Sequence, residues 1–475
     1  MTTKPEQPTG TLSRIFSLIK QSLNGEEADY TTGSIRRAVI LLAIPMMLEM
    51  IMESVFALVD LYFVGHLHNS SHAVQTVGLT ESVLTVIYSL AIGISMAATA
   101  VVARRIGEKN PEAAAKAGIQ AILIAFAFTL LISVSGVIYA REILLLMGAS
   151  EETATQGTPF VRIMMGSSLV IMFLFLINGI FRGAGNAAIA MKSLWLANIM
   201  NIILCPILIN GWGPVPAFGL TGAAMATAIG RGAGVVYQLY NLFNGKGTLK
   251  MRLSYFLPDW PQIGSLLKIA APGVFQFVIA SCSWIFLAYL VAKTGSDAGS
   301  AGYQTALRLM TFFILPAWGL SNAASTLVGQ NLGAGQLQRA QESVMKTVRY
   351  NVIFMILVTL FFLAGGHWFV AFFTDNPEIR EVAARALRII SLGYIFYGIG
   401  MVMMNTFNGA GDTWTPTVIN FIGFWLFQVP FAWFLARGLN MGPDGVFIAI
   451  PVAETAISIA GFIMFRRGGW KKVKV

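Results

Sequence analysis

Long apolar stretches recur along the whole chain and are separated by short polar loops. A stretch of about 20 apolar residues is long enough for a helix that crosses a bilayer. Counting such stretches predicts twelve membrane-spanning helices, and an even number puts both ends of the chain on one side. Their approximate ranges are 38–64, 74–103, 114–139, 158–181, 188–210, 219–243, 265–292, 301–328, 341–364, 386–408, 415–436 and 445–465.

The second half of the chain repeats the first at an offset of about 226 residues. The segment NGIFRGAGN at 178–186 returns as NTFNGAGD at 405–412, and the pair Gly219 and Gly222 returns as Gly442 and Gly445. Internal repeats of this kind indicate two similar structural units, here of six helices each. Because six is even, the two bundles run the same way across the membrane, related by a pseudo-twofold axis along its normal. We predict an all-α polytopic fold with a cleft between two bundles.

A polar segment that carries lysines, residues 244–262, separates the two bundles. This divides the chain into an N-lobe at 35–243 (helices 1–6), a linker at 244–262 and a C-lobe at 263–465 (helices 7–12). The N-terminal tail, residues 1–34, is expected to lie in the cytoplasm. It is either disordered or carries an amphipathic helix over residues 12–23 that lies in the membrane plane. A basic cytoplasmic tail, residues 466–475, follows the last span.

The composition is that of a membrane protein, with 56% hydrophobic and 11% charged residues and a mean hydropathy of +0.69. The formal net charge of +10 might suggest nucleic acid as a partner. Most Lys and Arg residues, however, lie in the tails and in alternate short loops, which is the positive-inside bias of membrane proteins. We therefore predict a multi-pass protein of the cell (inner) membrane, with both termini cytoplasmic and no nucleic-acid partner.

Three carboxylates lie on one side of the first predicted span, at Glu49, Glu53 and Asp60. At about 100° per residue, Glu53 lies about 40° around the helix from Glu49, and Asp60 returns to within about 20°. An ionised carboxylate that faces lipid costs about 3 kcal/mol or more, so the stripe should face protein or a water-filled cavity. There it either holds a proton or a cation, or is neutralised by basic partners that only tie helices together. Glu81, on the second span, is placed to approach Asp60, and carboxylates that share a pocket hold a proton near neutral pH.

Several motifs, in order and duplicated, resemble the multidrug and toxic compound extrusion (MATE) family over about residues 35–465. They are Pro45 fifteen positions before Asp60, VGQNLGAGQ at 328–336, FRGAGN at 181–186, FNGAGDT at 407–413 and GAAMAT at 222–227. The resemblance implies an antiporter that couples inward movement of protons or sodium ions to the export of organic cations, drugs or metabolites. It would alternate between outward-open and inward-open states. Pro45 would then be a hinge, whereas without the resemblance it is equally a static kink.

The resemblance also implies a cation site in the first half. In the family this site is built from the helix-1 aspartate, an asparagine and an aspartate on helix 5, and the threonine of the GAAxAT motif. The matching residues are Asp60, Asn201 and Thr227, but Cys205 stands in place of the helix-5 aspartate. A neutral thiol is a poor ligand for a hard cation. We therefore expect proton coupling, with sodium as the alternative, through a relay of Asp60, Glu81, Glu53 and Glu49.

The second half has almost no carboxylates in its predicted spans before Glu454, and Gln276 stands where the first half has Glu49. Polar residues on helices 7, 8, 10 and 11 are candidates to line the cleft, beside Met and Phe side chains that suit flat, cationic, amphipathic small molecules. Met and Phe in apolar helices equally serve packing or face lipid. The candidates are Gln276, Tyr303, Gln304, Tyr397, Asn405, Asn420 and Gln428.

No residue pattern supports an enzyme, since the sequence has no nucleophile elbow, Walker loop or zinc motif. His66, His68 and His72 cluster in an outer loop rich in Asn and Ser, which lacks the ordered partners that a metal site needs. We predict no catalytic residues, no metal and no cofactor, a monomer, and membrane lipids as the surroundings. One alternative is a lipid-linked oligosaccharide flippase of related architecture, which needs a cleft lined with Arg and Lys. Another, an acyl- or phosphotransferase, would have to use His367, which has no evident partner.

Overall fold

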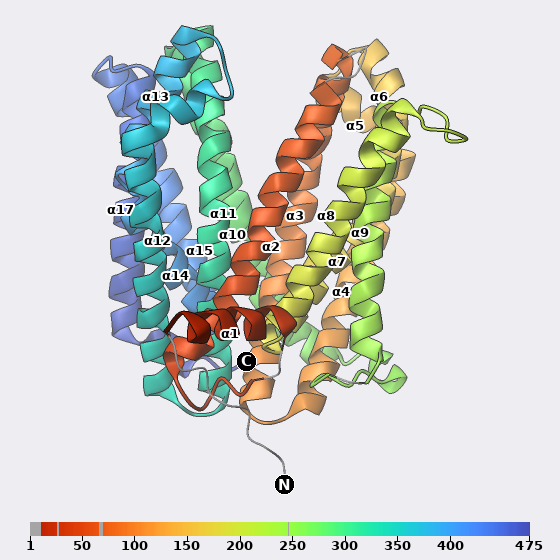
Figure 1. Ribbon diagram of the computed structural model, residues 1–475, viewed down its shortest axis with the longest axis vertical. Helices are drawn as coiled ribbons and strands as arrows, with labels where there is room; N and C mark the ends of the chain where they lie inside the picture. The colour runs from red at the N-terminus through yellow and green to blue at the C-terminus, as the bar shows by residue number, and fades with distance from the viewer. Residues whose placement is uncertain (1–10, 26–27, 66–69, 246) are drawn as a thin grey trace.

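Figure 1 shows the computed structural model, which describes residues 11–25, 28–65, 70–245 and 247–475. The helices form two bundles that converge at one end of the molecule and diverge toward the other. The first bundle, which we call the N-lobe, contains α2 (Ile35–Gly65), α3 (Ser70–Gly107), α4 (Pro111–Ile138), α5 (Ala140–Leu146), α6 (Glu151–Gly166), α7 (Ser168–Gly183), α8 (Ala187–Asn210) and α9 (Leu220–Phe243).

The second bundle, the C-lobe, follows a connection that contains the short 3-10 turn η1 (Leu253–Phe256). Within it, the segments η2 (Phe421–Gln428) and η3 (Phe434–Gly438) have the wider π-helical hydrogen bonding, which is rare and frequently found at functional sites. Its elements are α10 (Trp260–Thr294), α11 (Asp297–Gly333), α12 (Leu337–Ala371), α13 (Pro377–Ser391), α14 (Tyr394–Ala410), α15 (Trp414–Asn420), η2 (Phe421–Gln428), α16 (Val429–Trp433), η3 (Phe434–Gly438), α17 (Pro443–Arg467) and the turn η4 (Gly469–Lys472).

Twelve helical passes can be followed through the described residues, six in each lobe. Ten segments are long and apolar enough to cross a membrane, and α13 with α14 makes an eleventh as a bent pair. The twelfth, α9, carries Arg231 and Gln238 and packs along α8. The predicted architecture of two six-helix bundles is confirmed.

Two of the predicted spans are not single straight helices. The fourth is divided at Ser167 into α6 and α7, and the tenth bends by 58° between α13 and α14. A Cβ atom on Gly393, at this bend, would collide with Pro451 of α17, so the two segments meet α17 at a point where only glycine fits. An ion pair of 3.2 Å between Arg385 of α13 and Asp444 of α17 also connects these two helices.

The lobes touch each other at the end that holds α1 (Thr11–Asn24) and the C-terminal residues, which we call the basal end (Figure 1). There α2 packs on α11 and α3 packs on α10. A Cβ atom on Gly107 would collide with the backbone of Gln330, and one on Gly319 would collide with the backbone of Met46. Glycine at these positions allows the helices of the two lobes to approach closely. The loops RRIGEKN at 104–110 and QNLGAGQ at 330–336, which occupy corresponding positions in the two halves, therefore pack against each other.

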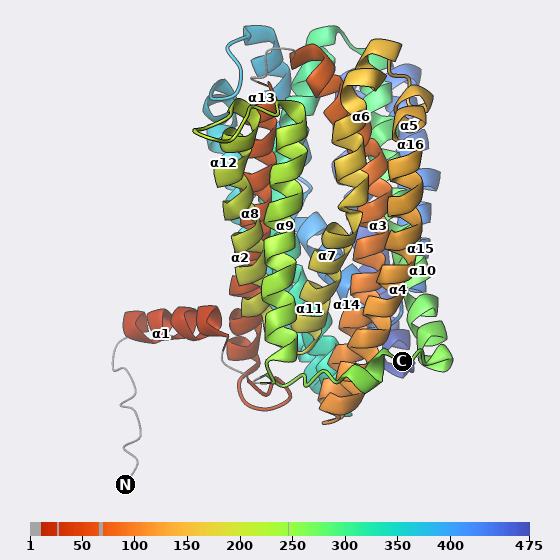
Figure 2. The ribbon, with the colours of Figure 1, turned by 90° about the vertical axis from the view of Figure 1, so that its right-hand side faces the viewer.

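Two chain segments cross between the lobes at the basal end. The first, residues 29–33, is the N-terminal strap; it joins α1, which lies nearly across the other helices (Figure 2), to α2. Arg339 of the C-lobe donates hydrogen bonds of 3.1, 2.7 and 2.9 Å to the carbonyl oxygens of Tyr30, Thr32 and Gly33. The Tyr30 hydroxyl donates to the carbonyl of Gly185 in the N-lobe at 3.1 Å. The strap thus binds both lobes.

The second segment, residues 473–475, is the C-terminal strap and follows the last helices of the C-lobe. Arg104 of α3 donates to the carbonyl oxygens of Val473 at 3.1 Å and of Ala410 at 3.2 Å. Its neighbour Arg105 donates to the carbonyl of Val475 at 3.1 Å. Each lobe therefore uses arginines to hold backbone carbonyls supplied by the other, which closes the basal end. We call the opposite end, where α5, α6 and α13 lie, the open end (Figure 1).

Candidate functional site

A cavity of about 410 Å³ lies between the two lobes. The N-lobe contributes side chains of α2, α3 and α7, and the C-lobe contributes side chains of α10, α11, α14, α15, η2 and α17. Much of the lining is aromatic or methionine, with single amides and hydroxyls between. The aromatic residues are Phe175, Phe277, Trp284, Trp318, Tyr397 and Phe424. Such a mixture is typical of sites for drug-sized ligands.

Four of the seven polar residues that the sequence proposed for the cleft line this cavity: Gln276, Tyr397, Asn405 and Asn420. The other three do not line it. Tyr303 is buried in the C-lobe, where its ring stacks on Phe447 with centroids 5.7 Å apart. Gln428 is also buried and accepts a hydrogen bond of 3.0 Å from Ser283, whereas Gln304 is exposed. These three side chains do not line the cavity, because their helices present other faces to it, and their role in the cleft stays a prediction.

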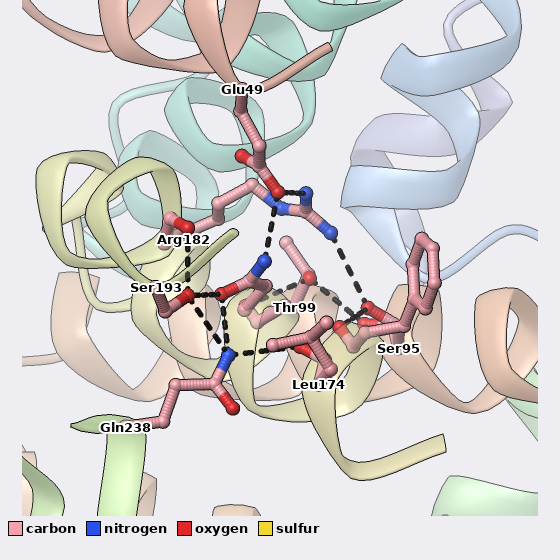
Figure 3. Close-up of polar contacts among 11 residues, drawn as sticks. Glu49, Ser95, Thr99, Leu174, Arg182, Ser193 and Gln238 are labelled. Atoms are coloured by element: carbon pink, nitrogen blue, oxygen red, sulfur yellow. Dashed lines mark hydrogen bonds and ion pairs between the residues drawn. The ribbon is translucent and has the colours of Figure 1, made fainter. Parts of the chain in front are cut away.

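Glu49 lies in the interior of the N-lobe, with only 2% of its side chain exposed, and one of its oxygens is shared by two donors (Figure 3). Arg182 of α7 donates to Oε1 at 3.0 Å, and Asn178, one turn earlier, donates to the same atom at 2.9 Å. The Arg182 guanidinium also reaches Ser95 of α3 at 3.4 Å. Glu49 is thus one member of a buried ion pair.

The polar network continues from Asn178 into α8 and α9 (Figure 3). The side-chain amide oxygen Oδ1 of Asn178 accepts hydrogen bonds of 2.8 Å from Ser193 and 2.6 Å from Gln238. Gln238 also donates to the carbonyl of Leu174 at 2.9 Å. Buried polar groups inside a membrane need such partners. The network therefore joins α2, α3, α7, α8 and α9 through side chains.

Glu53 is part of a second ion pair, farther toward the open end of α2. Arg231 of α9 donates to Glu53 at 3.1 Å and is almost fully buried. Its guanidinium lies over the rings of Phe56, Tyr88 and Phe175, with 5.0–6.0 Å to the ring centroids. Glu53 also accepts a hydrogen bond of 3.2 Å from Asn198. Cation–π contacts and the carboxylate together stabilise a buried guanidinium.

The remaining predicted ion-coupling residues lie in the N-lobe. The side chain of Asp60 is outside the described residues. Glu81 is exposed on α3. It lies within range of electrostatic attraction to Arg308 of α11, in the other lobe. Asn201 donates a hydrogen bond of 3.0 Å to Thr227, so two of the residues carried over from the family's cation site are in contact. Cys205 is buried one turn farther along α8. The roles assigned to these residues stay predictions, as does the hinge at Pro45, through which α2 continues as one helix.

The sequence reasoning missed the two arginines that pair with the acids. A signal was present, since Arg231 lies inside the predicted span 219–243 and Arg182 directly follows the span 158–181, in the same half as Glu49 and Glu53. A charge in a membrane helix normally faces a partner inside the bundle. The alternative that the acids are neutralised by basic partners therefore describes the observed geometry of Glu49 and Glu53.

The histidines of the outer loop were not expected to bind metal. His66 and His68 lie outside the described residues, and His72 makes a hydrogen bond of 2.8 Å with Thr153. In the part of the chain that the structure describes, no three His, Cys, Asp or Glu side chains come together as metal ligands would.

Comparison with known proteins gives consistent relatives over nearly the whole chain. The probable multidrug resistance protein NorM of Thermotoga maritima is 25% identical over 457 residues, covering 96% of this chain and 97% of the relative. The probable multidrug resistance protein YoeA of Bacillus subtilis is 25% identical over 445 residues, covering 93% and 96%. A solved structure, described as the outward-facing conformation of a multidrug resistance MATE family transporter, superposes with a TM-score of 0.87 at 24% identity, covering 94% and 98% of the two chains.

The family model agrees with the internal repeat. The model named MatE matches residues 45–207 and then again residues 272–434, once in each lobe. Since the two matches cover more than half of the sequence, the chain belongs to the MatE family, as its ordered motifs predicted.

Proposed function

We propose that this protein is a transporter and not an enzyme, an antiporter that exports organic cations, drugs or metabolites by alternating access. The observation that carries the proposal is the cavity between the lobes, since residues of both lobes line it. Movement of one lobe against the other would then change the shape and exposure of the site. The relatives named as multidrug resistance proteins, and the Staphylococcus aureus protein named multidrug export protein MepA, support the same activity.

The charges of the lining favour a cationic small molecule over an anionic one. Arg182 is the basic residue that lines the cavity in the described part of the chain, and Glu49 neutralises it. Aromatic side chains attract cations through their π faces. The flippase alternative requires unneutralised Arg and Lys for a pyrophosphate, and the lining residues do not supply them.

We assign the basal end to the cytoplasm of the cell membrane. Arg104, Arg105, Lys109 and Arg339 all lie at that end, and positive charge accumulates on the cytoplasmic side. With the lobes in contact at the basal end, the state described here would be outward-open. The arginine contacts to the two straps would break when the protein opens to the cytoplasm.

For the coupling ion we favour the proton over sodium. Cys205 occupies the position of a carboxylate ligand of the family's cation site, and a buried neutral thiol is a poor partner for Na⁺. Of the proposed relay, Glu49 and Glu53 are ion-paired with arginines, so they would exchange protons only if their pairs separate. Asp60 and Glu81, nearer the open end of their helices, are then the first candidates to bind an entering proton.

Transport into proteoliposomes tests the proposal. We expect uptake of ethidium when a pH gradient is imposed alone and none when a sodium gradient is imposed alone. The variant Asp60→Asn should abolish uptake while the protein remains in the membrane, and Asp444→Asn, which removes a partly exposed carboxylate that pairs with Arg385, should not. Uptake driven by sodium alone would contradict proton coupling. Unchanged uptake by Asp60→Asn would contradict the relay, and absence of any gradient-driven uptake would contradict antiport of this substrate class.

A further inference from the structure

Two glutamates are fully buried in the described part of the chain, and only one of them has a basic partner. Glu49 binds Arg182, as described above. Glu454, near the middle of α17, is 5% exposed and lines the cavity. Its Oε1 atom has no hydrogen-bond partner among the described residues. The C-lobe therefore holds a buried carboxylate that faces a cavity instead of an arginine.

The internal repeat shows how this difference arises. Aligning Gly219 with Gly442 places Arg231 of the N-lobe at the position of Glu454 in the C-lobe. Aligning Pro45 with Pro272 places Glu53 at the position of Ala280. In the N-lobe these two positions form an ion pair, whereas in the C-lobe an acid stands opposite an alanine. Both Ala280 and Glu454 line the cavity, so the space left by the missing partner is open to a ligand.

The neighbours of Glu454 offer hydrogen-bond acceptors and aromatic rings. The side-chain oxygens of Gln276 and Asn408, on the same cavity, are buried without a hydrogen-bond partner in the described structure, as is that of Glu454. Tyr397 and Trp284 line the same space as Glu454. A carboxylate, two amide oxygens and aromatic faces together match a positively charged group.

A buried carboxylate without a partner is unfavourable in a membrane interior, so such groups are retained where a partner arrives during function. We propose that Glu454 is the anion that binds the positive charge of the transported molecule, and that it selects lipophilic monovalent cations with aromatic groups over neutral molecules of the same shape. The proposal rests on the proposed function and adds the residue that provides charge selectivity. It places that residue in the C-lobe, away from the paired acids of the N-lobe.

The test compares two probes of similar shape and different charge on the purified full chain in lipid nanodiscs. Tetraphenylphosphonium carries a permanent positive charge, and triphenylphosphine oxide is neutral. We expect Glu454→Gln to weaken tetraphenylphosphonium binding at least tenfold, measured by calorimetry, and to leave triphenylphosphine oxide binding within about twofold. The matched control is Asp444→Asn, which removes the same charge from a partly exposed position on the same helix, outside the cavity lining, and should change neither affinity.

The outcomes separate this proposal from the proposed function. If wild-type protein binds tetraphenylphosphonium and Glu454→Gln binds it equally well, the role of Glu454 is overturned while cation binding by the cavity stands. If Glu454→Gln weakens both probes equally, its effect is on cavity shape, and charge selection is again overturned. If the wild-type protein binds neither probe, the proposed substrate class fails first.

A second variant keeps the test decisive if Glu454→Gln does not fold. Glu454→Asp retains the charge on a shorter side chain and should keep a preference for tetraphenylphosphonium over triphenylphosphine oxide. The double variant Glu454→Gln/Gln276→Glu moves the carboxylate to another position on the lining of the same cavity and should restore that preference. Equal affinity for both probes in these two variants would overturn the proposal.

Discussion

The N-lobe and the C-lobe share a fold but treat their buried charges in opposite ways. In the N-lobe, Glu49 pairs with Arg182 and Glu53 pairs with Arg231. The repeat places Gln276 at the position of Glu49 and Asn408 at the position of Arg182, so a charged pair has become two neutral amides. Those amides line the cavity with unpartnered oxygens. The N-lobe thus pairs its buried charges internally, whereas the C-lobe has uncharged amides at the corresponding positions, with oxygens on the cavity.

The difference shows which parts of a duplicated chain are tied to packing and which can change. The loop glycines recur in both halves because backbone approach requires them; Gly183 meets the backbone of Thr99 in the N-lobe just as Gly409 meets that of Ser325 in the C-lobe. Backbone packing does not require the buried Glu and Arg residues, so they can differ between the lobes where the changed side chain lies beside the cavity. The N-lobe is therefore expected to respond to mutation chiefly in stability, and the C-lobe chiefly in ligand binding.

Arg231→Leu should give the largest effect, because it leaves Glu53 without its cation inside the bundle. Breaking a buried ion pair by removing one partner costs about 3–5 kcal/mol. We expect a correspondingly lower thermal unfolding midpoint in detergent, or loss of the folded protein on expression. The double variant Arg231→Leu/Glu53→Leu removes both charges and should recover much of that stability. A double variant as unstable as the single one would show that the pairing of these charges is not what stabilises the N-lobe.

Ala280→Lys tests the comparison in the C-lobe. It places a basic residue at the position of Glu53, so that Glu454 gains an ion-pair partner like those of the N-lobe acids. The ammonium would compete with a cationic ligand, and we expect tetraphenylphosphonium to bind about a hundredfold more weakly, about 3 kcal/mol. Ala280→Met fills the same space without charge and is the control for size. If both variants lose the same affinity, volume at position 280 matters and charge does not.

Arg339→Ala should change the distance between the lobes at the basal end more than the packing inside either lobe. It removes hydrogen bonds to three carbonyl oxygens of the N-terminal strap, and a hydrogen bond from a charged donor contributes about 1.5–3 kcal/mol where it is buried and less where it is exposed. We expect the equilibrium to shift toward a basal-open state by about 1–2 kcal/mol. Spin labels on α4 and α12 near the basal end should report a longer distance between the lobes. Because Arg105 holds the C-terminal strap in the reciprocal direction, Arg105→Ala should shift the distance the same way.

The sequence was sufficient for the number of passes and the duplication, because both follow from the length of apolar stretches and from recurring glycine motifs. Of the residues proposed for the cleft, four line the cavity, Gln276, Tyr397, Asn405 and Asn420, and three do not, Tyr303, Gln304 and Gln428. Tyr303 and Gln304 show why: they are adjacent polar residues on one helix, yet the first packs in the core and the second is exposed. The rotation of a helix in an apolar bundle is set by tertiary packing. The pairing of Glu49 with Arg182, from helices far apart in sequence, depends on that same packing.

Replacing Asp29 should have the smallest effect on stability. This residue lies in the N-terminal strap at the basal end, so its variant tests a region outside the cavity. Partial burial alone would raise the pKa of its carboxyl, but hydrogen bonds from Lys109 and Thr31 outweigh this and lower the pKa to about 2. A lowered pKa means that the carboxylate contributes stability above its ordinary pKa of 3.8 and loses that contribution as the pH falls toward about 2. At every pH that a cell maintains, Asp29 therefore remains ionised, and its titration does not loosen the N-terminal strap.

The contribution itself is small, because the side chains of Asp29 and Lys109 are 42% and 64% exposed. Exposed ion pairs contribute about 1 kcal/mol or less and are screened by salt. Asp29→Asn should therefore lower the thermal midpoint slightly at pH 7 and low salt, and the difference from wild type should shrink both in about 1 M salt and as the pH is lowered from about 4 to about 2. A difference that persists at low pH would mean that the strap is held by the Thr31 contacts and the shape of its turn, with the Lys109 pair adding nothing.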